Sequence, residues 1–477
     1  MPTFRHTIDF PRERVAEWMA QPGAVARLTP GLAPLTPTSE ASSLADGTTR
    51  FAMPAGLKWV ARHKPTEFRE GTQFVDEVIN EPFHALTGWK HTHQFNETVS
   101  ASGEPATVLS DTVDTKFPVP GLGSMFAYRA TKLAGDLTAM DRLQEYIGGE
   151  IKPLTIAVSG ATGTVGTQLR ELLTTAGHTV VSLVRKPEQA KAPGNNGGDG
   201  GARYWNTDNP AADLLEGIDA VVHLAGAPIA GRFNDKHLAA IRHSRVEPTQ
   251  ALAEVIAKSS SVKVAVSASA VGFYGADRGT ETLPESASVG AEAARYDASA
   301  ENPAATDSLA AIVRDWEAAW EPARAAGKRV VNIRTGLVLA GGGGLLPLLA
   351  GTVFTGLGGP LGDGKQWFPW IALDDLLDIY HRAVVDESLE GPINATAPAS
   401  SGVDNAEFTR VLGEVLNRPT RIPVPAFGPK LLLGARGAQA LALANQRVVP
   451  AVLEESGHSW RFTSLRSALE HELLKEI

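Results

Sequence analysis

Thr155-Ile-Ala-Val158 runs directly into Ser159-Gly160-Ala-Thr162-Gly163-Thr164-Val165-Gly166, and this stretch decides the fold. Its first residues have the composition of a buried strand, and a helical apolar spacing follows over 165–176. Glycines at this spacing permit a tight turn and let the backbone approach a pyrophosphate, which meets the free N–H groups of the helix N-terminus. The stretch predicts a dinucleotide-binding turn, the alternative being a turn that holds no ligand. The predicted contacts are Gly160, Thr162, Gly163, Thr164, Val165 and Gly166.

The residues after this turn alternate apolar strands with helices. Further strands are expected at 179–184, 220–224, 262–266 and 329–333, and helices at 165–176, 236–258 and 307–326. Apolar strands that alternate with helices indicate a parallel sheet covered on both faces. The sequence therefore predicts a Rossmann-type α/β fold, a doubly wound parallel sheet, from about residue 150 onward.

The residue after the second expected strand bears on which dinucleotide is bound. An acid about 20 residues past the glycines would accept a hydrogen bond from the ribose 2′-OH of NAD. This chain has Val184-Arg185-Lys186 there and no acid. A guanidinium can hold a 2′-phosphate through paired charge-assisted hydrogen bonds. Arg185 therefore favours NADP(H) over NAD(H); the alternative is a solvated loop charge.

Residues 1–147 follow a different pattern, in which short runs alternate polar and apolar residues. Strands are expected at 74–79, 89–95 and 107–117, and helices at 12–19 and 125–146. A curved antiparallel sheet wrapped around a C-terminal helix uses this order of elements. Two glycines, Gly148 and Gly149, mark the predicted boundary between an α+β domain over 1–149 and the α/β domain over 150–477.

Composition excludes several classes of function. The chain has 477 residues, a net charge of −9 and no basic block, which argues against nucleic acid and anionic membranes as partners. It contains no cysteine, so disulfides, thiolate metal sites and cysteine nucleophiles are excluded. No apolar run approaches the roughly 20 residues that a membrane helix needs. A cytoplasmic location is expected.

Several motifs of the α/β part together resemble the extended short-chain dehydrogenase/reductase superfamily, in its NAD-dependent epimerase/dehydratase branch. They are the glycine turn, the strand end at Ala225-Gly226 and Ser267-Ala-Ser269-Ala-Val-Gly-Phe-Tyr274-Gly275. A sugar-nucleotide epimerase-like subgroup is further resembled at Arg334–Leu339, Trp370 and Asp374-Asp375, and its short helical C-terminal module at about 423–477. The resemblance implies a small C-terminal lobe for substrate. It adds Ala225, Gly226 and Ser267 as cofactor contacts.

The same resemblance implies a catalytic Tyr, a Lys four residues later and a Ser that holds the substrate oxygen. Ser269 occupies the serine position, the alternative being a plain strand-end cap. The positions of the Tyr and Lys hold Leu309 and Val313. Tyr274 is a candidate replacement; the alternative is a packing role. Tyr296 lies near the right distance from Gly275 but has no lysine four residues on. The one Tyr-x-x-x-Lys in the chain, Tyr128 and Lys132, is expected at the surface of an N-terminal helix.

Four further residues are candidates for substrate binding. Arg242 and Arg245, three apart on one expected helix, would clamp an anionic group, the alternative being a solvated helix face. Arg334 follows a buried strand and is expected either to point into the cleft or to pair with an acid such as Asp374. Trp370 is a candidate substrate platform, with a core position as the alternative.

The N-terminal part resembles the helix-grip superfamily of polyketide cyclases and START-like lipid carriers. The resemblance rests on Gly23, on Arg27-Leu-Thr-Pro30, on the segment from Trp89 to Phe95 and on the long last helix. It implies an apolar small-molecule ligand. His91 and His93 face one side of a strand, as metal ligands sometimes do, but without a third ligand no metal is predicted and a polar edge of the cavity is favoured.

Three hypotheses about function remain open. The first is an NADP(H)-dependent epimerase or oxidoreductase that acts on a small carbonyl or alcohol substrate, such as a nucleotide sugar or an apolar molecule passed from the N-terminal domain. The second is a non-catalytic sensor that couples NADP(H) binding to apolar-ligand binding. The third is an interaction protein that uses the nucleotide only for stability. The oligomeric state is open, with a homodimer as one option.

Overall fold

A parallel sheet of seven strands organises the larger part of the chain, in the order β10-β9-β8-β11-β12-β14-β18. The computed structural model describes residues 1–190, 200–289, 308–425 and 427–476. The strands are β8 (Thr155–Ser159), β9 (Thr179–Val184), β10 (Ala202–Tyr204), β11 (Ala220–His223), β12 (Val264–Ala270), β14 (Arg329–Thr335) and β18 (Gly391–Ala395). The strand order reverses direction at β8, which confirms the predicted doubly wound Rossmann-type sheet.

Helices cover both faces of this sheet. On one face, α5 (Thr164–Thr175) and α12 (Leu373–Val385) share a core with the strands; on the other, α8 (Val246–Lys258) and α10 (Glu321–Ala325) do so. Two helices predicted as single units are broken. Arg245 separates α7 (Asp235–His243) from α8, and α9 (Ser308–Ala318) ends before α10. Pro248 and Pro322 lie in the first turns of α8 and α10, where a proline ring would clash with a continuing helix.

A smaller lobe follows the sheet and has its own apolar core, formed by residues such as Phe368, Trp370 and Phe408. Its helices are α11 (Leu346–Phe354), α13 (Asn405–Leu416), α14 (Phe427–Gly437) and α16 (Leu465–Glu472), whereas α15 (Ala451–Glu455) packs on the parallel sheet at β18. Short strands pair in twos: β13 (Asp277–Leu283) with β20 (Asn445–Val448), β15 (Leu337–Leu339) with β17 (Trp370–Ala372), and β16 (Trp367–Phe368) with β19 (Val403–Asp404).

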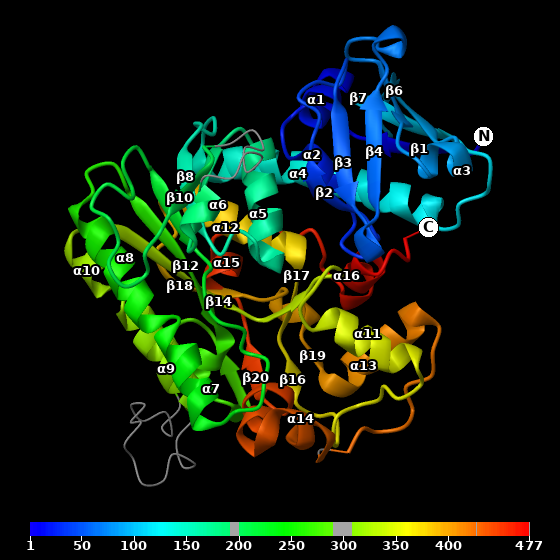
Figure 1. The fold of residues 1–477 in the computed structure, drawn as a ribbon. Helices are drawn as coiled ribbons and strands as arrows, with labels where there is room; N and C mark the ends of the chain where they lie inside the picture. Colours follow the sequence, from blue (N-terminus) through cyan, green and yellow to red (C-terminus); the bar gives the residue numbers. More distant parts are fainter. Residues whose placement is uncertain (191–199, 290–307, 426, 477) are drawn as a thin grey trace.

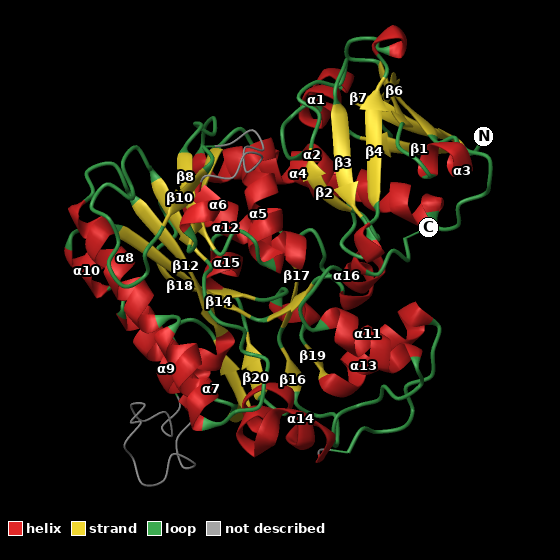
Figure 2. Ribbon diagram, viewed as in Figure 1, coloured by secondary structure: helices red, strands yellow, loops and turns green. Residues whose placement is uncertain are grey.

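The N-terminal part is an antiparallel sheet of seven strands in the order β1-β7-β6-β5-β4-β3-β2, separate from the parallel sheet (Figure 2). Its strands are β1 (Thr3–Ile8), β2 (Thr36–Ser39), β3 (Thr48–Ala52), β4 (Lys58–His63), β5 (Gln73–Val78), β6 (Lys90–Val99) and β7 (Pro105–Asp114). Its helices are α1 (Arg12–Met19), α2 (Ala24–Leu28), α3 (Phe83–Thr87) and α4 (Leu122–Ile147). Leu133 and Leu137 of α4 share a core with Phe74, Phe95 and Leu109 of the sheet.

Both parts of the chain follow the predicted order of elements. α4 ends and β8 begins on either side of the expected boundary at 149–150, and the division into domains stays a prediction. Among the described residues, no helix combines the length and the apolar character needed to cross a membrane. The expected cytoplasmic location likewise stays a prediction.

The N-terminal part docks on the side of the parallel sheet that carries α5 and α12, where α2 packs on α5 and α4 on α12 (Figure 1). Glycines allow a close approach. A Cβ on Gly31 would lie 2.6 Å from the Cα of Gly342, in the loop between β15 and α11. A Cβ on the adjacent Gly343 would lie 2.4 Å from Oγ1 of Thr164, the first residue of α5. The loop that contains Gly342 and Gly343 therefore contacts the N-terminal part on one side and the start of α5, next to the glycine turn, on the other.

Buried ion pairs cross this junction. Arg27 of α2 is fully buried; its Nε and Nη2 donate to the two oxygens of Asp136 at 2.9 and 2.8 Å. Its Nη2 lies 2.8 Å from Oδ1 of Asp374 on α12, and its Nη1 donates to Gln168 of α5 at 3.2 Å. Arg461, near the C-terminus, also reaches Asp136, at 2.7 Å. The Arg27 guanidinium thus connects the N-terminal part to α5 and α12, the two helices on this face of the sheet.

The predicted surface position of Tyr128 and Lys132 is wrong. Both are buried, at 5% and 1% exposure. The Nζ of Lys132 lies 2.9 Å from Oδ1 of Asp374, and the Tyr128 ring stacks on His471 at 4.3 Å. The reason is docking, which covers the outer face of α4 with α12 and α16.

The neighbouring Asp375 provides a pH prediction. Burial and the nearby Asp378 raise the pKa of Asp375 to about 8, although it accepts backbone N–H groups of Arg461 and Phe462. An acid with a raised folded-state pKa binds its proton more tightly when folded. Its contribution to stability is complete below about pH 4, the unfolded pKa, and is lost as the pH rises to about 8.

Asp375→Asn fixes this side chain as neutral. We expect the variant to become more stable relative to the wild type as the pH rises from 5 to 8, as measured by urea midpoints at several pH values. A stability difference that is constant over this range would contradict the prediction.

Candidate functional site

The glycine turn has the geometry that the sequence predicts. Gly160 has φ of +71°, and a Cβ on it would lie 2.8 Å from the carbonyl carbon of Leu224. A Cβ on Gly166 would lie 2.2 Å from the carbonyl oxygen of Gly160. Both positions therefore require glycine for the chain's own packing.

Gly163 differs, because its Cβ would make only an ordinary 3.4 Å contact with Gly160. It is the N-cap of α5, whose first N–H groups have no partner within the helix. Thr162, Gly163 and Thr164 are exposed, and Val165 is half-buried. The helix start is thus open to a phosphate-bearing ligand, and the missing side chain at Gly163 leaves room for its approach.

Arg185 lies beside this turn. Ser159 pairs in register with Leu183, so the ends of β8 and β9 meet at the same edge of the sheet, and Arg185 directly follows β9. Its side chain is exposed and has no acidic partner among the described residues. The guanidinium is therefore free to bind an anionic group next to the glycine turn.

The other predicted cofactor contacts differ in access. Ala225 is half-buried and Gly226 is exposed. A Cβ on Gly226 would lie 2.9 Å from Cζ of Arg245, so a larger residue here would require the buried Arg245 guanidinium to shift. Ser267 is fully buried and its hydroxyl donates to the Ala268 carbonyl at 3.0 Å, which leaves no side chain for a cofactor to touch.

A series of buried hydrogen bonds holds the ends of β8 and β11 in place. The sequence did not predict it. Ser159 Oγ accepts the backbone N–H groups of Leu224 and Ala225, at 3.2 and 3.3 Å, and its own proton points to Nδ1 of His223 at 2.8 Å. The other ring nitrogen of His223 then donates to Thr249 Oγ1 at 3.1 Å. Burial and the nearby Arg245 lower the pKa of His223 to about 3. The imidazole is neutral and holds the backbone of the turn in place.

Ser269 lies at the end of β12 in a network of charged and polar groups. Its Oγ donates to Oε1 of Glu317 at 2.6 Å, and Arg334 donates to both Glu317 oxygens at 2.9 Å. The partner of Arg334 is therefore Glu317 and not Asp374, which instead contacts Arg27 and Lys132. Glu317 on α9 is a site residue that the sequence could not identify, because only the fold brings it to the strand end.

Tyr274 belongs to the same network but is not accessible. It is fully buried; its hydroxyl donates to Asn394 Oδ1 at 2.7 Å and accepts from Arg334 Nη1 at 3.0 Å. Burial raises the pKa of Tyr274. The packing interpretation fits these contacts, and the candidate role as a substitute acid or base does not.

The positions expected for the Tyr and Lys pair face the correct segment. Leu309 and Val313 are buried on α9, and a Cβ on Gly272 would lie 3.6 Å from the Leu309 side chain and 4.0 Å from that of Val313. They thus lie beside the segment that begins at Ser269, but neither can transfer a proton. Tyr296 lies outside the described residues.

The remaining substrate candidates do not form a joint site. Arg242 is on α7, half-buried, and pairs with Glu247 and Asp315. Arg245 is buried between α7 and α8 and donates to backbone carbonyls such as that of Ala227, at 3.0 Å. The expected clamp on a single helix is therefore wrong, because the helix is broken between them.

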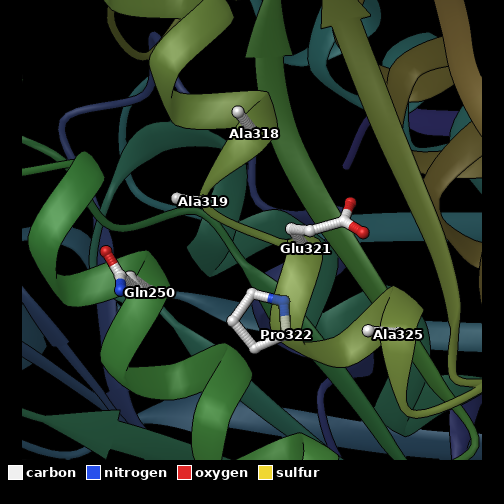
Figure 3. Close-up of a pocket in the computed structure, with 6 residues that line it drawn as sticks. All are labelled: Gln250, Ala318, Ala319, Glu321, Pro322 and Ala325. Atoms are coloured by element: carbon white, nitrogen blue, oxygen red, sulfur yellow. The ribbon is translucent and has the colours of Figure 1, made fainter.

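Trp370 is 1% exposed, and its Nε1 donates to the Ser401 carbonyl at 3.1 Å, so it belongs to the core of the lobe and offers no surface to a substrate. A hollow of about 360 Å³ lies between α8 and α10 (Figure 3). It is lined by Gln250, Ala318, Ala319, Glu321, Pro322 and Ala325. None of these residues belongs to the glycine turn or the Ser269 network.

Comparison with known proteins extends these observations. The profile of the NAD dependent epimerase/dehydratase family matches residues 156–394, and that of a domain of unknown function, DUF1731, matches 424–472. An epimerase family protein of Mycobacterium bovis is 34% identical over 317 residues, which are 66% of this chain and 96% of that protein.

Two crystal structures are similar. That of a nucleoside-diphosphate sugar epimerase from Corynebacterium glutamicum is 46% identical with a TM-score of 0.81, covering 100% of this chain and 91% of that one. That of the human epimerase family protein SDR39U1, solved with NADPH, is 30% identical with a TM-score of 0.56, covering 68% of this chain and 100% of that one.

Proposed function

Because this chain belongs to the NAD dependent epimerase/dehydratase family, we propose that it is an NADP(H)-binding enzyme of the epimerase or oxidoreductase class. The observation that carries the proposal is the exposed Arg185 beside the open N-terminus of α5. The helix start would hold the pyrophosphate, and Arg185 the 2′-phosphate. The human relative crystallised with NADPH supports this choice of cofactor.

Arg185→Ala tests the choice. We expect the wild-type chain to bind NADPH at least tenfold more tightly than NADH, a difference of about 1.4 kcal/mol. The variant should bind NADPH more weakly and NADH as before, so that the difference in affinity disappears. Fluorescence titration with both nucleotides measures the two affinities. Lys186→Ala, the adjacent exposed cation, is the matched control and should keep most of the gap. Equal affinities of the wild type for the two nucleotides would contradict the assignment.

For the chemistry, we propose a carbonyl or alcohol substrate, with a nucleotide sugar as one candidate because of the name of the Corynebacterium glutamicum relative. Bound NADP(H) would supply or accept a hydride. Ser269 would hold the substrate oxygen. In the alcohol direction the substrate hydroxyl would give its proton to Ser269 Oγ while the Ser269 proton moves to Glu317 across the 2.6 Å hydrogen bond, and the carbonyl direction would reverse both transfers. Arg334 would keep Glu317 ionised and oriented, while Tyr274 and Asn394 fix Arg334.

The N-terminal part is proposed to be a helix-grip carrier of an apolar small molecule. Its antiparallel sheet and its long last helix support this assignment. Joining a ligand-holding domain to a reductase-like domain raises the effective concentration of a molecule passed between them. A homodimer would be compatible with this arrangement.

A non-catalytic sensor is the second candidate, favoured by the apolar Leu309 and Val313 where a proton-transferring pair is expected. Incubation of the NADPH-loaded chain with candidate carbonyls, including nucleotide sugars, separates the two. Consumption of NADPH that Ser269→Ala reduces supports the enzyme. Full retention of NADPH and no epimerised product from nucleotide sugars, together with an NADPH affinity that an apolar ligand changes, support the sensor.

A further inference from the structure

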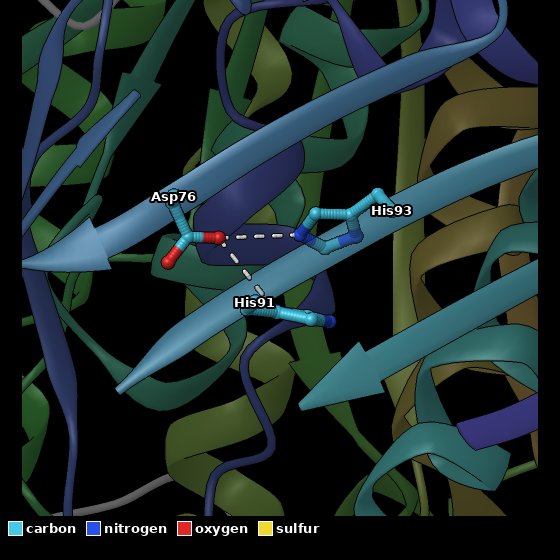
Figure 4. Close-up of side chains that lie close together, drawn as sticks. All are labelled: Asp76, His91 and His93. Carbon is cyan, nitrogen blue, oxygen red and sulfur yellow. Dashed lines mark hydrogen bonds and ion pairs between the residues drawn. The ribbon is translucent and has the colours of Figure 1, made fainter. Parts of the chain in front are cut away.

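The antiparallel sheet places two histidines and two carboxylates together, far from the glycine turn in sequence. His91 and His93 lie on β6 and face the same side of the sheet; Asp76 on β5 pairs in register with His91, and Asp111 on β7 with His93. The histidines and Asp111 are buried, and the Asp76 side chain is 15% exposed (Figure 4). The pairing of β5 with β6 supplies the third ligand that the sequence alone could not identify.

The separations within this cluster resemble the edges of a metal tetrahedron. Oδ2 of Asp76 lies 3.3 Å from Nε2 of His93 and 3.6 Å from Nδ1 of His91. The three candidate ligand atoms all lie within 4.8 Å of one another. Four ligands at the usual zinc–ligand lengths of about 2.0–2.1 Å lie about 3.3–3.4 Å apart. The 3.3 Å contact of Asp76 with His93 is a hydrogen bond, but it is longer than the usual length of about 2.7–2.9 Å for a charge-assisted one, so the separation also suits a cation shared between the two residues.

Asp111 completes the arrangement from the other side. Its Oδ1 lies 2.9 Å from Nε2 of His91 and 2.9 Å from Nδ1 of His93, in each case the ring nitrogen that does not face Asp76. Histidines that bind metals usually donate their second N–H to such a carboxylate, which orients the ring. Phe74 stacks on His93 at 4.0 Å and further restrains it.

We propose that Asp76, His91 and His93 form a three-ligand site for a divalent transition metal of the zinc type, with Asp111 orienting the His91 ring through a hydrogen bond and lying 2.9 Å from Nδ1 of His93. A dication would cancel the charges of the two carboxylates, which a buried site requires. Three protein ligands leave a fourth position for water or a ligand atom. The partial exposure of Asp76 provides the route by which the ion reaches the site.

The test uses the untagged, full-length chain, freed of metal with a chelator and titrated with Zn²⁺ by calorimetry and with Co²⁺ by visible absorption. One equivalent per chain is expected, with the intense absorption of tetrahedral Co²⁺. Asp76→Asn and His93→Gln should each weaken binding at least 100-fold, and Asp111→Asn by about 10–100-fold. His84→Gln, which alters an exposed histidine of α3, is the matched control and should bind normally.

Near-UV circular dichroism of each metal-free variant shows whether it is folded. If His93→Gln is unfolded, Asp76→Asn decides, because Asp76 lies nearest the surface of the three. A wild-type chain that takes up neither ion would overturn the proposal and leave a purely hydrogen-bonded cluster. Undiminished binding by a folded Asp76→Asn variant would overturn it as well. NADPH affinity is unaffected by either outcome, so this test is independent of the proposed function.

Discussion

Arg27→Ala is expected to lower the free energy of unfolding by about 3–5 kcal/mol, because it leaves buried carboxylates without one of their counter-ions. Arg27 is fully buried and contacts Asp136 and Asp374, which are 1% exposed. Arg461 stays paired with Asp136 and Lys132 with Asp374, at 2.7 and 2.9 Å, so each carboxylate keeps one counter-ion and the expected loss lies at the lower end of this range. Urea unfolding followed by circular dichroism measures the loss.

Arg14→Ala is the matched control, because Arg14 pairs with Asp141 across the same N-terminal part, at 2.7 Å, but with both side chains 41% exposed. Its expected cost is below about 1 kcal/mol. If the two variants lost equal amounts of unfolding free energy, the buried ion pairs of Arg27 would contribute no more to stability than an exposed pair.

Gly166→Ala is expected to reduce NADPH affinity at least 100-fold, about 2.7 kcal/mol, and to destabilise the chain without ligand by about 1–3 kcal/mol. The reason is that its Cβ would lie 2.2 Å from the Gly160 carbonyl oxygen, a contact that only a shift of the turn can relieve. Fluorescence titration and urea unfolding measure the two effects.

Gly163→Ala separates the two effects, because its Cβ would meet only a 3.4 Å contact within the chain. We expect it to lose at most about 1 kcal/mol of stability, because alanine is a poorer N-cap than glycine, and still to lose NADPH affinity, since the added methyl group would lie where the pyrophosphate approaches. Gly351→Ala, whose Cβ would meet no atom within 4 Å, is the control; it should leave NADPH affinity unchanged and, as an alanine inside α11, raise the stability by about 0.5–1 kcal/mol. Normal NADPH binding by both turn variants would rule out the turn as the cofactor site.

The glycine turn, the parallel strands and the order of the N-terminal elements could be predicted from sequence because each is a local pattern. The two helix breaks were not predicted, although Pro248 and Pro322 favour them. The apolar residues keep a helical spacing across each break, and this pattern indicated a continuous helix in spite of the proline. Glu317 as the partner of Arg334 could not be predicted, because α9 reaches the end of β12 only through the fold.

Pairing register and domain docking account for the other omissions. Asp76 joins His91 and His93 only through the alignment of β5 with β6, which no local pattern specifies. Tyr128 and Lys132 are polar residues on a helix and therefore seemed exposed. Their burial depends on a second layer of chain more than 200 residues away, as in the 242-residue separation between Lys132 and Asp374.

The loop at 341–343 is packed closely on both sides. Gly342 approaches Gly31 of the N-terminal part, and Gly343 approaches Thr164, the first residue of α5. Gly31 and Gly342 meet backbone to backbone, whereas Gly343 faces the Thr164 side chain, whose rotamer can change. A displacement of the antiparallel sheet would therefore act directly on the loop at 341–343, and would reach the first turn of α5 only through the Thr164 side chain.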